Sequence, residues 1–146
     1  MPTFTVTKRL AAPPDAVWDV LADFGNVDWI PGPSDVRVEG EGPGMRRFIA
    51  ASSEKPVIET LIWIKPDERA LSYEIANNPM PVSRFVAVNT VSESTGAAGE
   101  STVVWDIDYE PIGDDAAARD AMEAVYGLMA GWVQDFANGG GSRQNT

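Results

Sequence analysis

The sequence predicts an α+β fold in which seven antiparallel strands form one curved sheet and a long C-terminal helix covers its concave face. Segments with the alternation of half-buried strands follow one another through the middle of the chain, separated by short breaks rich in glycine, proline and asparagine. Such short breaks join neighbouring strands as hairpins, which makes the sheet antiparallel. Helical periodicity is found in two places, briefly near the N-terminus and again over residues 116–137.

The first strand is expected over residues 3–10, where side chains alternate between the two faces. Ala12-Pro13-Pro14-Asp15 then begins a helix, because prolines in a first helical turn remove no hydrogen bond. The apolar stripe of this helix consists of Val17, Trp18, Val20, Leu21 and Phe24. Gly25 ends it, and residues 26–30 are expected to add one more helical turn before Pro31-Gly32-Pro33. The sequence therefore predicts two short helices after the first strand.

Six further strands are expected, over residues 35–39, 45–53, 56–64, 70–76, 82–92 and 101–110. The last of them shows which face is buried, because its apolar residues occupy alternate positions. Val103, Trp105, Ile107 and Tyr109 should face the long helix, and the acidic residues between them should face water. Leu71, Tyr73 and Ile75 predict the same inward face on another strand.

The final helix should begin after Asp114-Asp115, whose side chains can cap its first turn, and should continue to about Ala137. Its apolar stripe is predicted to contain Ala121, Met122, Val125, Leu128, Met129, Trp132 and Phe136. The 146-residue length fits a single domain, which we place at residues 1–138. Residues 139–146 are rich in glycine and polar side chains and are expected to form a flexible polar tail.

Composition excludes several classes of chemistry. The chain has no cysteine and no histidine, so a disulfide framework, a zinc finger, a thiolate nucleophile, an imidazole base and a Ser-His-Asp triad are all impossible. No metal site is predicted. Eleven basic and 22 acidic side chains give a net charge of -11, which argues against a nucleic-acid partner. No membrane span or signal peptide is recognised, and the absence of cysteine fits a cytoplasmic location.

Several motifs together resemble one superfamily. They are APPDAVWDVLADFGNVDWIPG at residues 12–32, GPGMRR at 42–47, IETL at 58–61, LSYEI at 71–75, PMPVSRF at 79–85, STVVW at 101–105 and YEP at 109–111. In this order and spacing they resemble the SRPBCC, or START-like, superfamily, and within it the polyketide cyclase/dehydrase branch. The resemblance covers roughly residues 3 to 137.

The resemblance implies a helix-grip fold, in which the seven-stranded antiparallel sheet wraps around the C-terminal helix and encloses a hydrophobic cavity. It is less specific about function, because the superfamily includes aromatic polyketide cyclases, lipid carriers and hormone receptors. We therefore weigh the polar residues that can point into such a cavity one by one.

Arg46 and Arg47 are neighbours on a strand, so only one of them can point inward. Position 47 matches the arginine of the family motif, and we favour it. An inward Arg47 can bind a ligand carboxylate, phenolate or enolate, or it can form an ion pair with Glu59 on the neighbouring strand. Glu59 is a candidate acid or base if it faces the cavity. Its orientation is ambiguous, because Ile58, Ile62 and Ile64 make the opposite face look like core as well.

Tyrosines supply further polar groups. Tyr73, Tyr109 and Tyr126 can each place a hydroxyl in a mainly apolar space, either to contact a ligand or as core residues with one hydrogen bond. Arg84 and Asn89 are additional candidates on the sixth strand, although either can point outward.

Aromatic and sulfur-containing side chains are candidates for the apolar wall. Trp29 lies beside the Pro-Gly-Pro segment, where it can stack on a planar ligand, act as part of a gate, or simply plug the core. Trp105 and Met129 fit the space between the sheet and the final helix, and methionines there can also be gap fillers. Residues 77–81 are a candidate lid or a proline-stiffened hairpin connection.

The first functional hypothesis is binding of a small hydrophobic or aromatic molecule, polyketide-like or lipid-like, in the cavity. The alternative is a cyclase or dehydratase in which Arg47 stabilises an enolate and Glu59 or a tyrosine such as Tyr73 moves protons. Neither needs a cofactor. A third possibility is a subunit that acts only through protein contacts. The protein is expected to be a monomer or a homodimer.

Overall fold

The computed structural model describes residues 2–26, 29, 36–49, 56–78, 80–93 and 99–139. Its strands form one antiparallel sheet in the order β1-β7-β6-β5-β4-β3-β2. The strands are β1 (Thr3–Leu10), β2 (Val36–Glu39), β3 (Arg46–Ile49), β4 (Val57–Lys65), β5 (Ala70–Ala76), β6 (Val82–Glu93) and β7 (Ser101–Pro111). The helices are α1 (Pro14–Ala22), the short 3-10 helix η1 (Pro66–Glu68) and α2 (Asp115–Ala137). The predicted α+β fold is confirmed.

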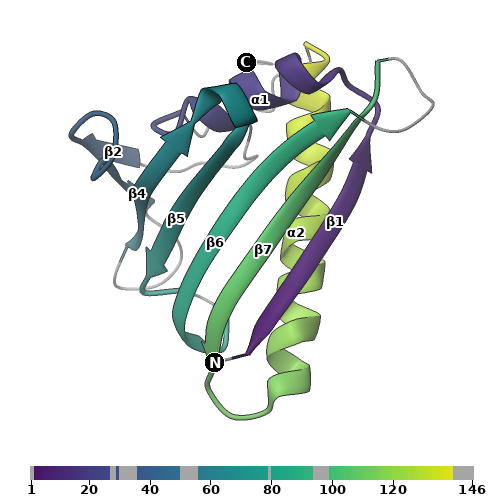
Figure 1. Cartoon of the computed structure of the whole chain (residues 1–146). Helices are drawn as coiled ribbons and strands as arrows, with labels where there is room; N and C mark the ends of the chain where they lie inside the picture. The colour runs from purple at the N-terminus through teal and green to yellow at the C-terminus, as the bar shows by residue number, and fades with distance from the viewer. Residues whose placement is uncertain are drawn as a thin grey trace, which may run out of the picture.

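The sheet curves around α2, which runs along its concave side (Figure 1). Each strand pairs with the next along the chain except β1, which closes the sheet at the other edge by pairing with β7. Helix α1 lies across the end of the sheet where the C-terminal part of α2 ends, and it packs against both α2 and β6. A space is thus bounded by the sheet, α1 and the middle of α2.

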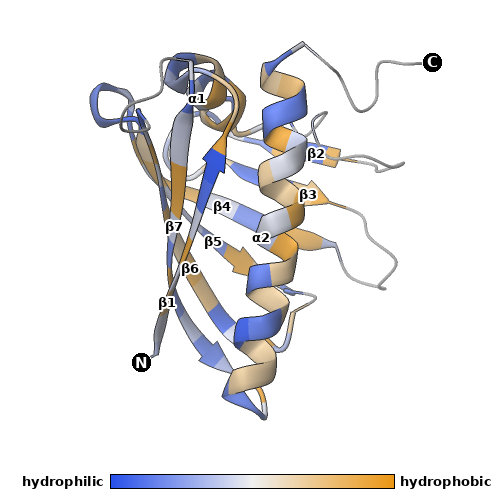
Figure 2. Ribbon diagram, turned by 90° about the vertical axis from the view of Figure 1, so that its right-hand side faces the viewer, coloured by the Kyte–Doolittle hydropathy of each residue, from blue (hydrophilic) through white to orange (hydrophobic). Residues whose placement is uncertain are grey.

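The inward face predicted for β7 is confirmed. Val103, Trp105, Ile107 and Tyr109 are all buried. Viewed from the side, α2 runs along one face of the sheet, and apolar and polar residues are interspersed along the strands (Figure 2). Helix α2 begins with Asp114 as its cap, whose side chain accepts a hydrogen bond from the amide of Ala116.

One member of the predicted stripe of α2 lies elsewhere. Leu128 is 59% exposed, whereas Met122, Tyr126, Ala130 and Val133 are the buried positions around it. These buried positions are three or four residues apart, and Leu128 lies outside that spacing. Tyr126 replaces it on the face that meets the sheet.

Strand β4 contains an irregularity that sequence periodicity did not predict. The pairing with β5 skips a residue between Leu61 and Trp63, so Ile62 has no partner. Before this bulge, Glu59 and Leu61 are buried, and after it Ile64 packs against the core. A single extra residue therefore changes which alternate positions face inward. This resolves the ambiguous alternation of the strand.

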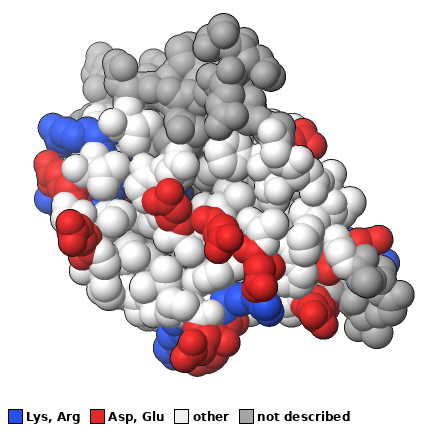
Figure 3. All heavy atoms as spheres, turned by 90° about the horizontal axis from the view of Figure 1, so that it is seen from above, with Lys and Arg blue, Asp and Glu red and all other residues white. Residues whose placement is uncertain are grey.

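The second short helix expected at residues 26–30 lies mostly outside the described residues, as do residues 50–53 of the expected third strand and residues 140–146 of the expected tail. Acidic side chains outnumber basic ones on the molecular surface seen from above in Figure 3. Among the helices of the described residues, none combines the length and the apolar character needed to cross a membrane.

Candidate functional site

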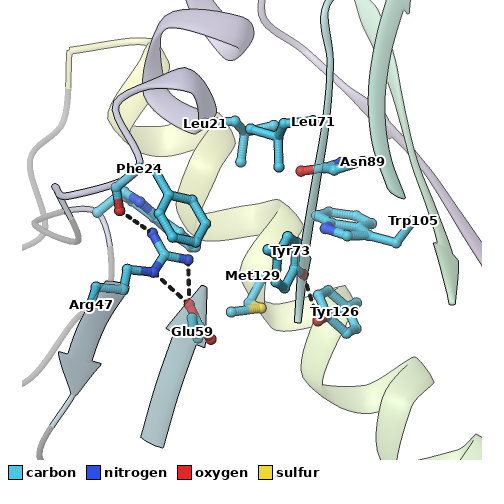
Figure 4. Close-up of a pocket in the computed structure, with 11 residues that line it drawn as sticks. Leu21, Phe24, Arg47, Glu59, Leu71, Tyr73, Asn89, Trp105, Tyr126 and Met129 are labelled. Atoms are coloured by element: carbon cyan, nitrogen blue, oxygen red, sulfur yellow. Dashed lines mark hydrogen bonds and ion pairs between the residues drawn. The ribbon is translucent and has the colours of Figure 1, made fainter. Parts of the chain in front are cut away.

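Two pockets lie between the sheet and α2. The first, which we call the polar pocket, has a volume of about 20 Å³, which is room for about one water molecule. Its polar lining consists of Arg47, Glu59, Tyr73, Asn89 and Tyr126, and its apolar lining of Leu21, Phe24, Trp29, Leu71, Trp105 and Met129 (Figure 4).

The second pocket, which we call the apolar pocket, is larger, at about 150 Å³. Ile49, Val57, Ile75, Met80 and Val125 line it, together with one polar side chain of its own, Asn78. Glu59, Tyr126 and Met129 line both pockets and therefore form the wall between them.

Arg47 and Glu59 form a buried ion pair at this wall. They lie directly opposite each other on β3 and β4, and their side chains are 8% and 7% exposed. The Nε of Arg47 donates to Oε1 of Glu59 at 2.5 Å, and its Nη2 contacts the same oxygen. Arg46 points the other way and pairs with Glu39 on the surface at 2.9 Å. The expectation that Arg47 is the inward arginine agrees with this placement.

The remaining surface of the Arg47 guanidinium is also in contact with protein. Its Nη1 donates to the carbonyl oxygen of Phe24 at 2.7 Å, and the group lies 4.0 Å from the centre of the Phe24 ring. Most of its hydrogen-bonding capacity and its charge are therefore used inside the protein. Among the described residues, Oε2 of Glu59 has no partner, because both contacts from Arg47 reach Oε1.

Tyr73 and Tyr126 form a second buried pair beside the first. Their hydroxyl oxygens are 2.7 Å apart, and either can be the donor. Burial raises the pKa of Tyr73 above the ordinary value of 10.0, and the nearby Glu59 carboxylate raises it further. Burial likewise raises the pKa of Tyr126. Both tyrosines therefore stay protonated near neutral pH and can donate hydrogen bonds, but they are poor bases.

Aromatic rings surround the two tyrosines. Trp105 lies 5.0 Å from Tyr126, ring centre to ring centre, and Phe85 stacks on the other side of Tyr126 at 6.1 Å. Trp29 is 4% exposed, and its indole Nε1 donates to the carbonyl of Asn26 at 3.2 Å. These rings fix the position of the tyrosine hydroxyls and keep water away from them.

Asn78 carries an unused donor next to the apolar pocket. Its Oδ1 accepts a hydrogen bond from the amide of Met80 at 2.9 Å, which identifies the other amide atom as Nδ2. Nδ2 is buried and has no partner among the described residues. A buried donor without an acceptor is costly, so a bound acceptor at this position would be favourable. Asn78 and Met80 belong to the segment that is a candidate lid or hairpin connection, and both residues line the apolar pocket.

Two of the expected ligand-binding residues are not brought to either pocket. Arg84 points to the outer face of the sheet and pairs with Asp108 at 3.1 Å. The pairing of β6 is irregular between Val82 and Arg84, after which Phe85 and alternate residues face inward. Tyr109 is fully buried, but its hydroxyl donates to Asp115 at the start of α2. Both residues serve the structure of the domain in this arrangement.

Several pocket residues were missed among the sequence candidates. Leu71, Leu21 and Phe24 were recognised only as core residues, and Asn78 only as part of a loop. Asn89 was a sequence candidate together with Arg84, and the orientation of both side chains was left open. Because the two residues are five positions apart on one strand, their side chains must point to opposite faces. This odd spacing was the sequence signal that could have distinguished the inward residue from the outward one. Asn89 lines the polar pocket, with its Nδ2 donating to the carbonyl of Val104 at 3.1 Å.

Chemically, this arrangement combines an apolar space with a carboxylate oxygen, two protonated phenols and an amide donor. Within the described residues, no group of carboxylates is clustered as a metal site. Such an inventory can orient a small molecule through hydrogen bonds and can exchange a proton with it through Glu59.

Comparison with known proteins identifies the fold and the family. A family model described as "Polyketide cyclase / dehydrase and lipid transport" matches residues 1–137. The comparison with curated proteins finds no match.

Solved structures share the fold at low sequence identity. An uncharacterised protein from Bacillus thuringiensis has a TM-score of 0.77 at 23% identity, with 94% of this chain and 99% of that chain covered. A protein from Thermobifida fusca has a TM-score of 0.71 at 25% identity, with 94% of both chains covered. Norcoclaurine synthase from Thalictrum flavum, solved with dopamine and hydroxybenzaldehyde, has a TM-score of 0.71 at 14% identity, with 94% of this chain and 86% of that chain covered.

Proposed function

Because the chain belongs to the family of polyketide cyclases, dehydrases and lipid-transport proteins, we propose that it binds a small hydrophobic or aromatic molecule in the apolar pocket between the sheet and α2. The observation that supports this most directly is the pocket itself. Protein interiors are close-packed, with few voids larger than a water molecule. This apolar space of about 150 Å³ is partly open to solvent, and its volume is comparable to that of cavities that bind benzene.

The lining of the pockets suits such a ligand. Val125, Ile75 and Met80 offer apolar surface, and Met129 can adapt its shape because its side chain is unbranched. Tyr126 contributes a hydroxyl at the inner end. Tyr73, Trp105 and Trp29 line the adjoining polar pocket, where they would contact only a ligand that extends past Met129. The complex of norcoclaurine synthase supports the idea that this fold can accommodate small aromatic molecules.

Filling the pocket tests the proposal. Val125→Trp places a large side chain from α2 into the apolar pocket and should abolish binding of neutral one- and two-ring aromatic compounds, measured by calorimetry and by native mass spectrometry. Leu128→Trp is the matched control, because Leu128 lies on the same helix but is 59% exposed. It should bind as the unmodified protein does. Absence of any binding in the unmodified protein, or equal binding in Val125→Trp, would contradict the proposal.

A second candidate is a cofactor-independent cyclase or dehydratase. It is favoured by one specific observation, namely that Oε2 of Glu59 is not used by Arg47 and lies in a side chain that lines both pockets. In this case Glu59 would move the proton, and Arg47 with a tyrosine hydroxyl would stabilise an enolate. Glu59→Gln should then abolish turnover of an enolisable aromatic compound while the protein still binds it. Unchanged turnover would exclude this role.

A further inference from the structure

We propose that the apolar pocket selects an uncharged, one-ring aromatic molecule that has a hydroxyl group for Glu59 and a carbonyl or ether oxygen for Asn78, and that it discriminates against carboxylates. This inference rests on the proposed function, and it specifies the chemical class of the ligand. It depends on three observations: the sign of the free charge at the pocket, the position of the unused donor, and the volume.

The charge at the pocket wall favours a hydrogen-bond donor. Glu59 is more than nine-tenths buried and lines the apolar pocket, and its Oε2 accepts nothing from the described residues. Arg47 lines only the polar pocket, and its contacts go to Glu59 and Phe24. A ligand in the apolar pocket therefore meets a carboxylate oxygen before it meets a cation. A hydroxyl satisfies that oxygen, whereas a second carboxylate would be repelled by it.

The amide of Asn78 favours an acceptor at a different place. Asn78 lines the apolar pocket but not the polar one, so it is not part of the wall that Glu59, Tyr126 and Met129 form. Its Oδ1 is held by the amide of Met80, so the side chain cannot turn over to accept a hydrogen bond from the ligand. Only an acceptor on the ligand can satisfy the buried Nδ2.

The volume of the apolar pocket suits a ligand portion of about one ring. Cavities of about 150 Å³ hold a molecule the size of benzene. The adjoining polar pocket has room for about one water molecule, so it cannot take a second ring without rearrangement. The ligand is thus a monocyclic phenol with a further oxygen, rather than a long fatty acid or a fused polycycle.

A series of matched compounds tests the preference of Glu59 for a hydrogen-bond donor on the ligand. Calorimetric dissociation constants would be measured for ethylbenzene, 4-ethylphenol and 4-ethylbenzoate, which differ only in the para group. We expect 4-ethylphenol to bind about tenfold or more tighter than ethylbenzene, as a hydrogen bond to a charged group provides. 4-Ethylbenzoate should bind more weakly than ethylbenzene. In the Glu59→Gln variant, 4-ethylbenzoate should bind more tightly than 4-ethylphenol, because the positive charge of Arg47 is then no longer neutralised.

Asn78 is tested with 4-hydroxyacetophenone, which adds a carbonyl to the phenol. Asn78→Asp keeps the acceptor for the amide of Met80 but removes the donor. It should therefore weaken the binding of 4-hydroxyacetophenone about fivefold and leave the binding of 4-ethylphenol nearly unchanged. Ala76→Asp is the control, because it adds the same charge to an exposed neighbour that does not line the pocket and has no side-chain hydrogen bond to lose.

The outcomes separate this inference from the proposed function. If the unmodified protein binds none of the four compounds, the proposed function itself is contradicted. If it binds ethylbenzene and 4-ethylphenol equally, or 4-ethylbenzoate most tightly, the pocket binds apolar molecules but the inference is wrong. Circular dichroism checks the fold of Glu59→Gln; should that variant unfold, the order of the compounds on the unmodified protein and the Asn78→Asp comparison still decide the question.

Discussion

The two pockets share a wall but are packed in opposite ways. The polar pocket contains an ion pair, two tyrosine hydroxyls and several aromatic rings, and they leave room for only about one water molecule. The apolar pocket, on the other side of Glu59, Tyr126 and Met129, has less polar lining and several times the volume. Buried polar groups need partners at fixed distances, so the protein packs tightly around them, whereas apolar walls tolerate empty space. We therefore propose that the polar pocket is the rigid support and that the apolar pocket is the space for a ligand.

The largest expected effect comes from breaking the ion pair of the polar pocket. Arg47→Met leaves Glu59 as an uncompensated buried carboxylate and should lower the free energy of unfolding by about 3–5 kcal/mol in urea titrations. The matched control is Arg46→Met on the same strand. Arg46 pairs with Glu39 at an exposed position, so its loss should cost no more than about 1 kcal/mol. Equal losses in the two variants would show that the buried pair is not the rigid support.

Enlarging a side chain on each side of the shared wall compares the free space directly. Leu71 lines the polar pocket and Ile75 the apolar pocket, and both belong to β5. Leu71→Phe should overpack the polar pocket and cost about 1–3 kcal/mol of unfolding free energy. Ile75→Phe should change stability by less than about 1 kcal/mol, because its ring can enter empty space. If Ile75→Phe is the more damaging change, the apolar pocket is not free in solution.

Removing one hydroxyl of the tyrosine pair should have a smaller effect. Tyr73→Phe leaves the hydroxyl of Tyr126 buried without its partner, which should cost about 1–2 kcal/mol. The double variant Tyr73→Phe/Tyr126→Phe has no orphaned hydroxyl and should be destabilised by less than the sum of the two single changes, as measured by a double-mutant cycle. Strict additivity would mean that the two hydroxyls do not interact.

The smallest effect is the pH dependence of stability. Burial raises the pKa of Tyr73, Tyr126 and Tyr109 above the ordinary value of 10.0, so above that pH the unfolded chain loses protons that the folded protein retains. Stability should therefore fall as the pH rises past about 10, with Tyr73 alone contributing about 1 kcal/mol at about pH 10.5 to 11. Urea titrations from about pH 9 upward measure this fall. It should be shallower in the Tyr73→Phe/Tyr126→Phe variant, and an identical slope would contradict the assignment.

The fold was predictable because its signals are local. Alternation along β7, the breaks between strands and the long stripe of α2 are all visible in adjacent residues, and they predicted the seven strands and the covering helix. Leu128 was misplaced because a wide apolar stripe includes positions at its margin, and only packing decides which of them is covered.

The site was predictable in part, because it depends on which face each strand turns inward. Arg47 was selected by a motif, and its pairing with Glu59 follows from strands that are neighbours in the sheet. The outward direction of Arg84 follows from its odd spacing to Asn89 on β6, whereas Glu59 was left ambiguous by the bulge in β4. No proline or glycine adjoins Ile62 to mark that bulge. The volume of the pockets and the unused amide of Asn78 arise from three-dimensional packing, which periodicity does not describe.

The bulge at Ile62 has a consequence for how this domain can change. It separates β4 into two halves whose inward faces are set independently, with Glu59 in the first half and Ile64 in the second. Deleting Ile62 would remove the bulge and leave both halves with their present inward faces, because Glu59, Leu61 and Ile64 would then follow one another at every second position. A one-residue change in length that the bulge does not absorb would instead turn one half over, so that either the acid or an apolar residue would face the outside. Strand length, and not only residue identity, thus determines whether an acidic group is presented to the interior, so a one-residue insertion or deletion could create or erase a binding chemistry in a single step.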